Sequence, residues 1–100
     1  MSTRTAQMES VPSPATPLRP SPDVIARHLG DGAVLVHLPT NRVFELNHTG
    51  SRVWELIGEG MPIPQMVQTL VAEFDMDPEG VEADVNDLIA WLRDENLLQR

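Results

Sequence analysis

The segment "FELNHTGSRVWELI", which begins at Phe44, changes from a strand pattern to a helix pattern within a few residues. Before Asn47 the side chains alternate with a period of two, as in a strand with one buried face. After Asn47, small or apolar residues recur at the i, i+3, i+4 and i+7 positions of one helix face: Gly50, Val53, Trp54 and Ile57. The Asn47 side chain can accept a hydrogen bond from an amide of the first helical turn, with Thr49 as the alternative cap. The sequence therefore predicts a strand that enters a capped helix directly, with Trp54 in the core.

Two further apolar runs precede this junction, and turn residues separate all three. The runs are "DVIARHL" at 23–29, "AVLVHL" at 33–38 and "RVFEL" at 42–46, with "GDG" and "PTN" between them. β-Branched runs of this length, separated by Gly, Asp, Pro and Asn, predict a three-stranded antiparallel meander.

Three helices are expected after the strands. The first ends near Gly60, which suits the left-handed position after a helix. The second spans about 64–74, although its start, "MPIPQM", lacks a clear side-chain cap. The third begins at Pro78 after an Asp77 cap, and Asn96 can end it in the left-handed conformation. Its core stripe is Val81, Val85, Leu88, Ile89 and Leu92. Three strands followed by three helices predict an α+β domain in which a small sheet packs on helices.

A proline-rich tail, residues 1–21, is predicted to precede a single domain at residues 22–100. Five prolines lie in or next to this tail: Pro12, Pro14, Pro17, Pro20 and Pro22. Such a segment buries too little apolar area to offset the entropy lost on ordering. We therefore expect a flexible tail that acts as a linker, with a docking arm for a partner as the alternative.

The composition excludes several classes of protein. The chain has no cysteine, so disulfides and thiolate metal sites are absent, which suits a reducing cytoplasm. No apolar run approaches the roughly 18 to 20 residues that a membrane-spanning helix needs. The first residues also lack the apolar core of a secretory signal. We therefore expect a cytoplasmic protein without a membrane span.

The charge of the chain disfavours nucleic acid as a partner. The formal net charge is −8, and fourteen of the fifteen acidic residues follow residue 21. In a winged-helix regulator the third helix would enter a DNA groove, but here it has one arginine, Arg93, among seven acidic residues in and beside it. DNA binding needs clustered Lys and Arg, so a neutral or basic partner is the better electrostatic match.

No pattern of catalytic or metal-binding residues is apparent. The three histidines, His28, His37 and His48, fall in different predicted elements, which argues against a metal site. Ser51 lies one turn after His48, but no acid completes a triad and no nucleophile elbow surrounds it. The Gly-rich turns lack the Lys of a phosphate-binding loop. We therefore expect a protein that is not an enzyme and needs no metal or cofactor.

Three stretches together resemble one known family. They are "GDGAVLVHLPTNRVFELNHTGSRVWELI" from Gly30, "VQTLVAEFDMDPEGVEADV" from Val67 and "LIAWLRDENLL" from Leu88. They combine a hairpin, an "LNxTGxxVWEL" strand-to-helix junction and a "DPExxExDV" helix start. In this order and spacing they resemble the PqqD-like family of RiPP recognition elements, over about residues 22–98. The resemblance implies a fold similar to a winged helix-turn-helix.

The resemblance also implies a function, that of a peptide chaperone. Such a protein would bind the leader segment of a ribosomally synthesised precursor peptide as an extra strand and present it to a maturation enzyme. That enzyme would be, for example, a leader peptidase or a radical-type modifying enzyme. The implied leader-binding residues are Arg42, Val43, Phe44, Glu45 and Leu46 of the third strand, with Asp84, Leu88, Trp91 and Glu95 in the region of the third helix.

The residues themselves are compatible with this role. The third strand of a meander has an unpaired edge, which an extended peptide can use. Trp91 lies about 100° round the helix from the core residue Leu92, which predicts a position at the rim of the core. A half-buried Trp that only covers the core is the alternative. Glu45, Asp84 and Glu95 favour a leader with Lys or Arg.

The chain departs from the family pattern at three places. The second helix starts with "MPIPQM", where such proteins often have a Thr or Ser cap followed by acidic residues. The chain also has "PTN" where the branch that acts in coenzyme PQQ synthesis has "PER", which favours another pathway, such as that of a lasso peptide. Asn96 stands where Gly is more usual. Two other functions stay open, a subunit-interaction module without leader binding and a winged-helix DNA-binding regulator. We expect a monomer or a weak homodimer.

Overall fold

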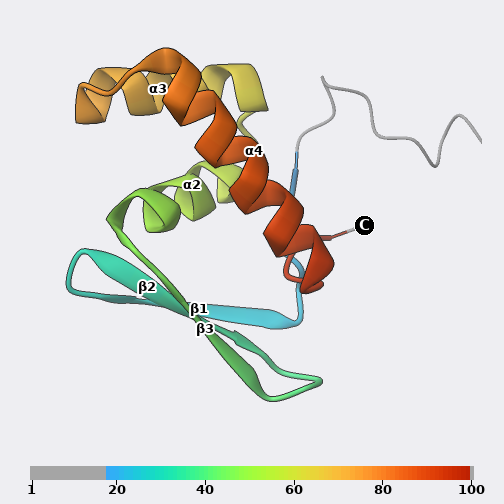
Figure 1. Ribbon diagram of the computed structural model, residues 1–100. Coiled ribbons are helices and arrows are strands. Elements are labelled where there is room, and N and C mark those ends of the chain that lie inside the picture. Colours follow the sequence, from blue (N-terminus) through green and yellow to red (C-terminus); the bar gives the residue numbers. More distant parts are fainter. Residues whose placement is uncertain (1–17, 100) are drawn as a thin grey trace, which may run out of the picture.

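The computed structural model describes residues 18–99 and begins with a three-stranded antiparallel sheet (Figure 1). Its strands are β1 (Val24–Leu29), β2 (Gly32–His37) and β3 (Arg42–Leu46), in the order β1-β2-β3. The predicted meander is therefore confirmed. Because β2 lies in the middle, β1 and β3 are the two edge strands.

The two faces of the sheet differ in burial. Across β2 and β3, Ala33 pairs with Leu46 and Leu35 with Phe44, and all four side chains are buried. Val43, which alternates with Phe44, points to the other face and is 62% exposed. The period of two in the sequence thus places the buried side of β3 against the helices.

The chain passes from β3 into α2 (His48–Gly58) at the predicted cap. Asn47 has extended backbone, and its Oδ1 accepts a hydrogen bond of 2.8 Å from the Gly50 amide. Asn47, not Thr49, is thus the cap. Trp54 is 9% exposed and belongs to the core, as predicted. The abrupt change of sequence pattern therefore marks a capped helix start.

The other two helices are α3 (Ile63–Phe74) and α4 (Pro78–Asp94). Helix α3 begins one residue earlier than predicted and has no side-chain cap. Asp77 caps α4, since its Oδ2 accepts from the Gly80 amide at 3.1 Å. Gly60 and Asn96 both have positive φ, as expected from their places after a helix, and Asp75 after α3 adopts the same conformation.

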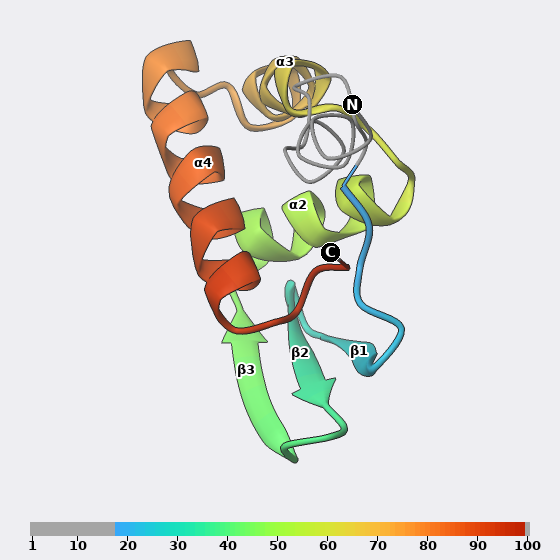
Figure 2. The same cartoon turned by 90° about the vertical axis from the view of Figure 1, so that its right-hand side faces the viewer.

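All three helices lie on one side of the sheet, and α4 approaches β3 (Figures 1 and 2). Helix α2 contacts β2 and β3, while α3 packs on α4 and α2. The core lies between these layers, and six of its side chains have no exposed area: Leu35, Ile57, Met66, Leu70, Leu92 and Leu97. The fold is α+β, with a three-stranded antiparallel sheet followed by three helices, as predicted. No described helix is long and apolar enough to cross a membrane.

The first described residues lie beside the last ones. Pro20 forms an isolated bridge with Leu98, and the Ser21 amide donates to the Leu97 carbonyl at 3.0 Å. Leu18 packs against the core. Most of the predicted tail, residues 1–17, lies outside the described residues, so its flexibility stays a prediction.

Candidate functional site

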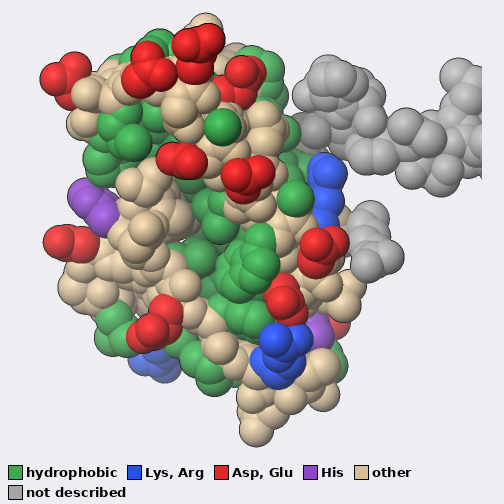
Figure 3. All heavy atoms as spheres, viewed as in Figure 1, with side chains coloured by type: hydrophobic (Ala, Val, Ile, Leu, Met, Phe, Trp, Pro, Cys, Tyr) green, Lys and Arg blue, Asp and Glu red, His purple; other side chains and the backbone are tan. Residues whose placement is uncertain are grey.

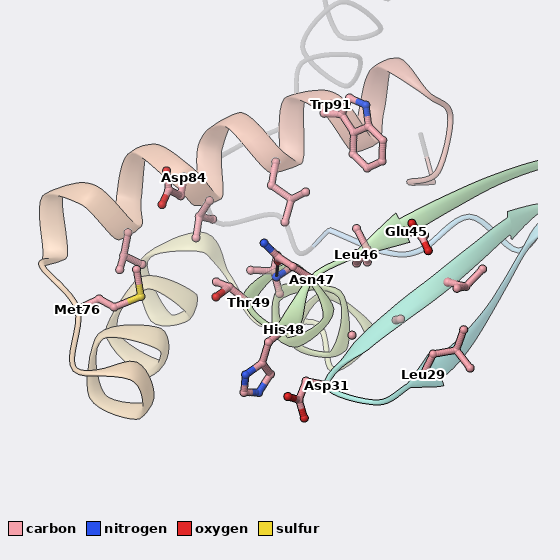
Figure 4. Close-up of a pocket in the computed structure, with 18 residues that line it drawn as sticks. Leu29, Asp31, Glu45, Leu46, Asn47, His48, Thr49, Met76, Asp84 and Trp91 are labelled. Atoms are coloured by element: carbon pink, nitrogen blue, oxygen red, sulfur yellow. Dashed lines mark hydrogen bonds between the residues drawn. The ribbon is translucent and has the colours of Figure 1, made fainter.

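A groove of about 1070 Å³ lies between α4 and the junction of β3 with α2 (Figure 4). Helix α4 lines it with Val81, Asp84, Val85, Leu88 and Trp91. The opposite side comes from the end of β3, the start of α2 and the β1–β2 turn. In the space-filling view, hydrophobic side chains gather in and around a hollow on this face, with acidic side chains around them (Figure 3).

The structure brings five of the nine predicted site residues together in this groove: Glu45, Leu46, Asp84, Leu88 and Trp91. Leu88 was also predicted as a core residue, and it is partly buried at the edge of the core. The other four predicted residues, Arg42, Val43, Phe44 and Glu95, do not line the groove. Val43 points to the far face of the sheet, while the remaining three form a cluster at one end of the groove.

Trp91 both packs on the core and borders the groove. It is partly buried, and its ring meets Phe44 edge-on with 5.4 Å between centroids and an 82° interplanar angle. This geometry is favourable for aromatic pairs. Trp91 is therefore half-buried over the core and also lies at the rim of the groove, with its ring against Phe44, while its contact with a leader stays a prediction.

An ion pair closes this end of the groove. Arg42 donates to Glu95 at 2.7 Å, which links β3 to the residue after α4, and its guanidinium lies 4.9 Å from the centre of the Phe44 ring. The Glu95 side chain is 23% exposed. Since Arg42 already neutralises Glu95, this carboxylate is less able to attract a basic peptide than the sequence suggested.

One edge of β3 is open. Among the described residues β3 pairs with β2 and with no other strand, so its second edge has no backbone partner. This edge lies beside the groove, since Glu45 and Leu46 belong to both. An extended peptide could therefore pair with β3 and place alternate side chains in the groove.

Sequence reasoning missed the other end of the groove. Asp31, His48, Thr49 and Met76 line it there, from the β1–β2 turn, the start of α2 and the turn before α4 (Figure 4). In a meander the β1–β2 turn lies at the same end of the sheet as the last residue of β3. That rule could have placed Asp31 near the junction, whereas Met76 depends on how α4 crosses the sheet.

A polar network lies outside this groove. Arg52 donates to Glu73 through two nitrogens, at 2.9 and 2.8 Å, and to Glu55 at 3.1 Å. The hydrogen bonds from Arg52 hold the pKa of the Glu73 carboxyl below its usual range. Glu55 also lies 3.1 Å from His28 Nε2. The network therefore ties β1, α2 and α3 together.

Ser51, next to His28 in this network, completes the order Ser51–His28–Glu55, which superficially resembles a catalytic triad. Its Oγ lies 3.5 Å from Nδ1 of His28, whose other ring nitrogen faces Glu55. However, 3.5 Å is long for a hydrogen bond to a hydroxyl, and Ser51 is only 4% exposed. A substrate carbonyl would have no direct path to this hydroxyl, so the arrangement is better explained as packing of α2 on β1.

The three histidines are dispersed, as predicted. His28 contacts Glu55, His37 lies 2.8 Å from Thr40, and the His48 ring meets Phe74 with 5.0 Å between ring centroids. Within residues 18–99, no group of three His, Asp or Glu side chains is placed to hold a metal ion.

Comparisons with known proteins point to one family. The family model described as coenzyme PQQ synthesis protein D (PqqD) matches residues 32–98. The structure titled TbiB1 in complex with the TbiA(beta) leader peptide is 36% identical, with a TM-score of 0.76 over 81% of this chain and 94% of that one. A lasso peptide synthetase B1 complexed with its leader peptide shares the fold, with a TM-score of 0.77 at 19% identity over 84% of this chain and 99% of that one. No curated protein matches the sequence significantly.

Proposed function

We propose, because this chain belongs to the PqqD family, that it binds the leader segment of a ribosomally synthesised precursor peptide and presents it to a maturation enzyme. One observation carries the proposal. A protein 36% identical to this chain, and covered over 94% of its length, is described as a complex with a leader peptide. At that identity and coverage, leader binding is expected to be shared, and the groove and open strand edge of this chain offer a place for the peptide.

The proposed binding mode uses β3 and α4. The leader adds as a strand on the open edge of β3, where backbone hydrogen bonds align it with the strand. Alternate side chains then enter the groove and contact Leu46, Leu88 and Trp91. Ordering a disordered peptide costs about 2 to 5 kcal/mol, so these apolar contacts must supply most of the affinity.

The cluster at the end of the groove has a supporting part in this mode. Phe44 is buried beneath the Trp91 ring, and the Arg42–Glu95 pair spans the two walls beside it. These three residues hold Trp91 in position and do not themselves face the groove. Val43 points away, and its exposed side chain would stay beside the added strand.

The chain is proposed to act as a binding partner of an enzyme and not as a catalyst. Its relatives are described by their complexes with leader peptides, which supports delivery of a peptide to a separate maturation enzyme, such as a leader peptidase. The pathway that fits best is that of a lasso peptide, and the compartment is the cytoplasm. A subunit-interaction module without leader binding is the alternative that the test below addresses.

Titration with leader peptides tests the proposal. The probes are fluorescent peptides with the sequences of the N-terminal halves of short precursor peptides encoded near this gene. At least one of them should bind the wild type. Replacing Leu88 with Ala should weaken that binding at least about tenfold, the effect of removing an interface hot spot. Val71→Ala is the matched control, because Val71 is also partly buried on the core but lies on α3, away from the groove.

Two results would contradict the proposal. If no neighbouring precursor peptide binds the wild type, leader binding fails as the function. If Leu88→Ala and Val71→Ala bind equally well while circular dichroism shows both folded, the peptide lies elsewhere on the protein.

A further inference from the structure

The groove differs in charge between its two ends. Beside Trp91, the carboxylate of Glu95 is neutralised by Arg42. Three other carboxylates line the groove: Asp31 and Asp84 lie farther from Trp91, and Glu45 lies closer to it on β3 (Figure 4). No described residue forms an ion pair or a hydrogen bond with any of these three side chains, and none of the residues that line the groove is Lys or Arg. The groove is therefore acidic at the end away from Trp91.

Two of these carboxylates flank the groove from opposite sides. Asp84 projects from α4 and Asp31 from the β1–β2 turn, with Thr49 of α2 between them (Figure 4). Met76 adds an apolar contact beyond them and is 38% exposed. A side chain that enters here would meet the Asp84 carboxylate on the α4 side and the apolar Met76 at its end. Asp31 lines the opposite wall beside His48, with its carboxylate directed away from α4 (Figure 4).

Any peptide that fills the apolar part of this groove must also partly cover these carboxylates. Removing a carboxylate from water without a partner is unfavourable, because the charge loses its hydration. A cationic side chain removes that penalty and adds a charge-assisted hydrogen bond. A neutral or acidic side chain at the same place would leave the carboxylates unpaired, so the groove discriminates against it.

We propose that this end of the groove selects a leader peptide with a Lys or Arg whose charged group lies against Asp84, with Asp31 adding to the negative charge of the same end. This inference rests on the proposed leader binding and adds the chemistry of the ligand. An apolar residue of the same peptide packs on Leu88 and Trp91. The charge thus fixes the direction in which the peptide lies along β3.

The geometry also sets the spacing between the two peptide residues. Asp84 and Trp91 are seven positions apart on α4, or about 10 Å along the helix axis. An extended chain covers about 10 Å in three residues. Because only alternate side chains face the groove, the basic residue lies two or four positions from the apolar anchor, and a long Lys or Arg side chain covers the difference.

A charge swap tests the inference. The probe is the neighbouring precursor peptide that binds the wild type best, and each of its Lys and Arg residues is changed in turn to Glu. One such change should weaken binding to the wild type at least about tenfold, since opposed like charges are strongly unfavourable at an interface. Asp84→Lys should restore much of the loss for that peptide and weaken binding of the original one.

Glu82→Lys is the matched control, because Glu82 is exposed on α4 and does not line the groove. It should restore nothing. The inference is overturned if a peptide binds the wild type and no charge reversal in it changes the affinity more than about twofold, or if Glu82→Lys restores binding as well as Asp84→Lys. In those cases leader binding itself still stands. If no peptide binds the wild type, both proposals fail.

Discussion

The groove and the polar network use carboxylates in opposite ways. In the network, Glu55 and Glu73 are engaged by Arg52 or His28 at 2.8 to 3.1 Å. In the groove, no described Lys, Arg or His forms an ion pair with Asp31 or Asp84. Carboxylates of the first kind contribute to folding, whereas those of the second kind are available to a ligand. The contrast separates residues that hold the domain together from residues that recognise a partner.

The largest expected effect comes from Phe44, whose ring packs on the core and also supports Trp91 at the groove. Phe44→Ala should lower the free energy of unfolding by about 3 to 5 kcal/mol, because it removes a buried ring and leaves a cavity beneath Trp91. Val43→Ala, one residue away and 62% exposed, should change it by less than about 0.5 kcal/mol. Urea denaturation followed by circular dichroism measures both. Equal effects of the two substitutions would mean that β3 does not pack as described.

A smaller effect is expected at the strand-to-helix junction. Asn47→Ala removes the cap acceptor for the Gly50 amide and should destabilise the protein by about 1 kcal/mol. Asn47→Asp keeps an acceptor oxygen and adds a negative charge at the start of α2, so it should retain most of the stability. Thermal unfolding of the three proteins decides this. Full stability of Asn47→Ala would show that the cap contributes nothing.

The smallest effect distinguishes the two kinds of carboxylate. Glu73 holds its charge to lower pH in the folded protein than in the unfolded chain, because hydrogen bonds from Arg52 lower its pKa. Its contribution to stability is therefore fully present above the ordinary carboxyl pKa of about 4.3 and is lost as the pH falls below it. Glu73→Gln should be slightly less stable than the wild type at pH 7, and the difference should shrink as the pH falls below the ordinary carboxyl pKa.

In the groove, the substitution to compare with Glu73→Gln is Asp84→Asn. It should cost no stability at pH 7, since no partner is lost, but it should weaken a basic leader about twofold to fivefold. Unfolding curves at several pH values, with a peptide titration at pH 7, measure both. If Asp84→Asn destabilises the protein as much as Glu73→Gln, the separation of the two roles is wrong.

Local patterns in the sequence predicted most of the fold. The meander follows from apolar alternation and turn residues, and the caps Asn47 and Asp77 follow from their places before helical repeats. Gly60 and Asn96 could be assigned because a left-handed residue after a helix favours Gly or Asn. Asp75, which adopts the same conformation, carries a weaker signal.

The same local patterns could not predict contacts between residues that are far apart in the sequence. Arg42 and Glu95 are 53 positions apart, and their pairing depends on how α4 crosses the sheet. The family resemblance placed both among the leader-binding residues, because Arg42 belongs to β3 and Glu95 follows α4. The sequence alone could not show that they neutralise each other. Met76 at the acidic end of the groove was missed for the same reason.

Amide hydrogen exchange of the protein with and without a bound leader peptide compares the two edges of the sheet in a single measurement. Strand addition at β3 should slow exchange of the amides in Arg42–Leu46 that face the open edge, while those of β1, the other edge strand, exchange as before. Slower exchange in α4 around Leu88 and Trp91 is a weaker expectation, since those amides are already bonded within the helix. If a saturating leader leaves β3 unchanged, or protects β1 instead, the peptide does not bind at the edge of β3.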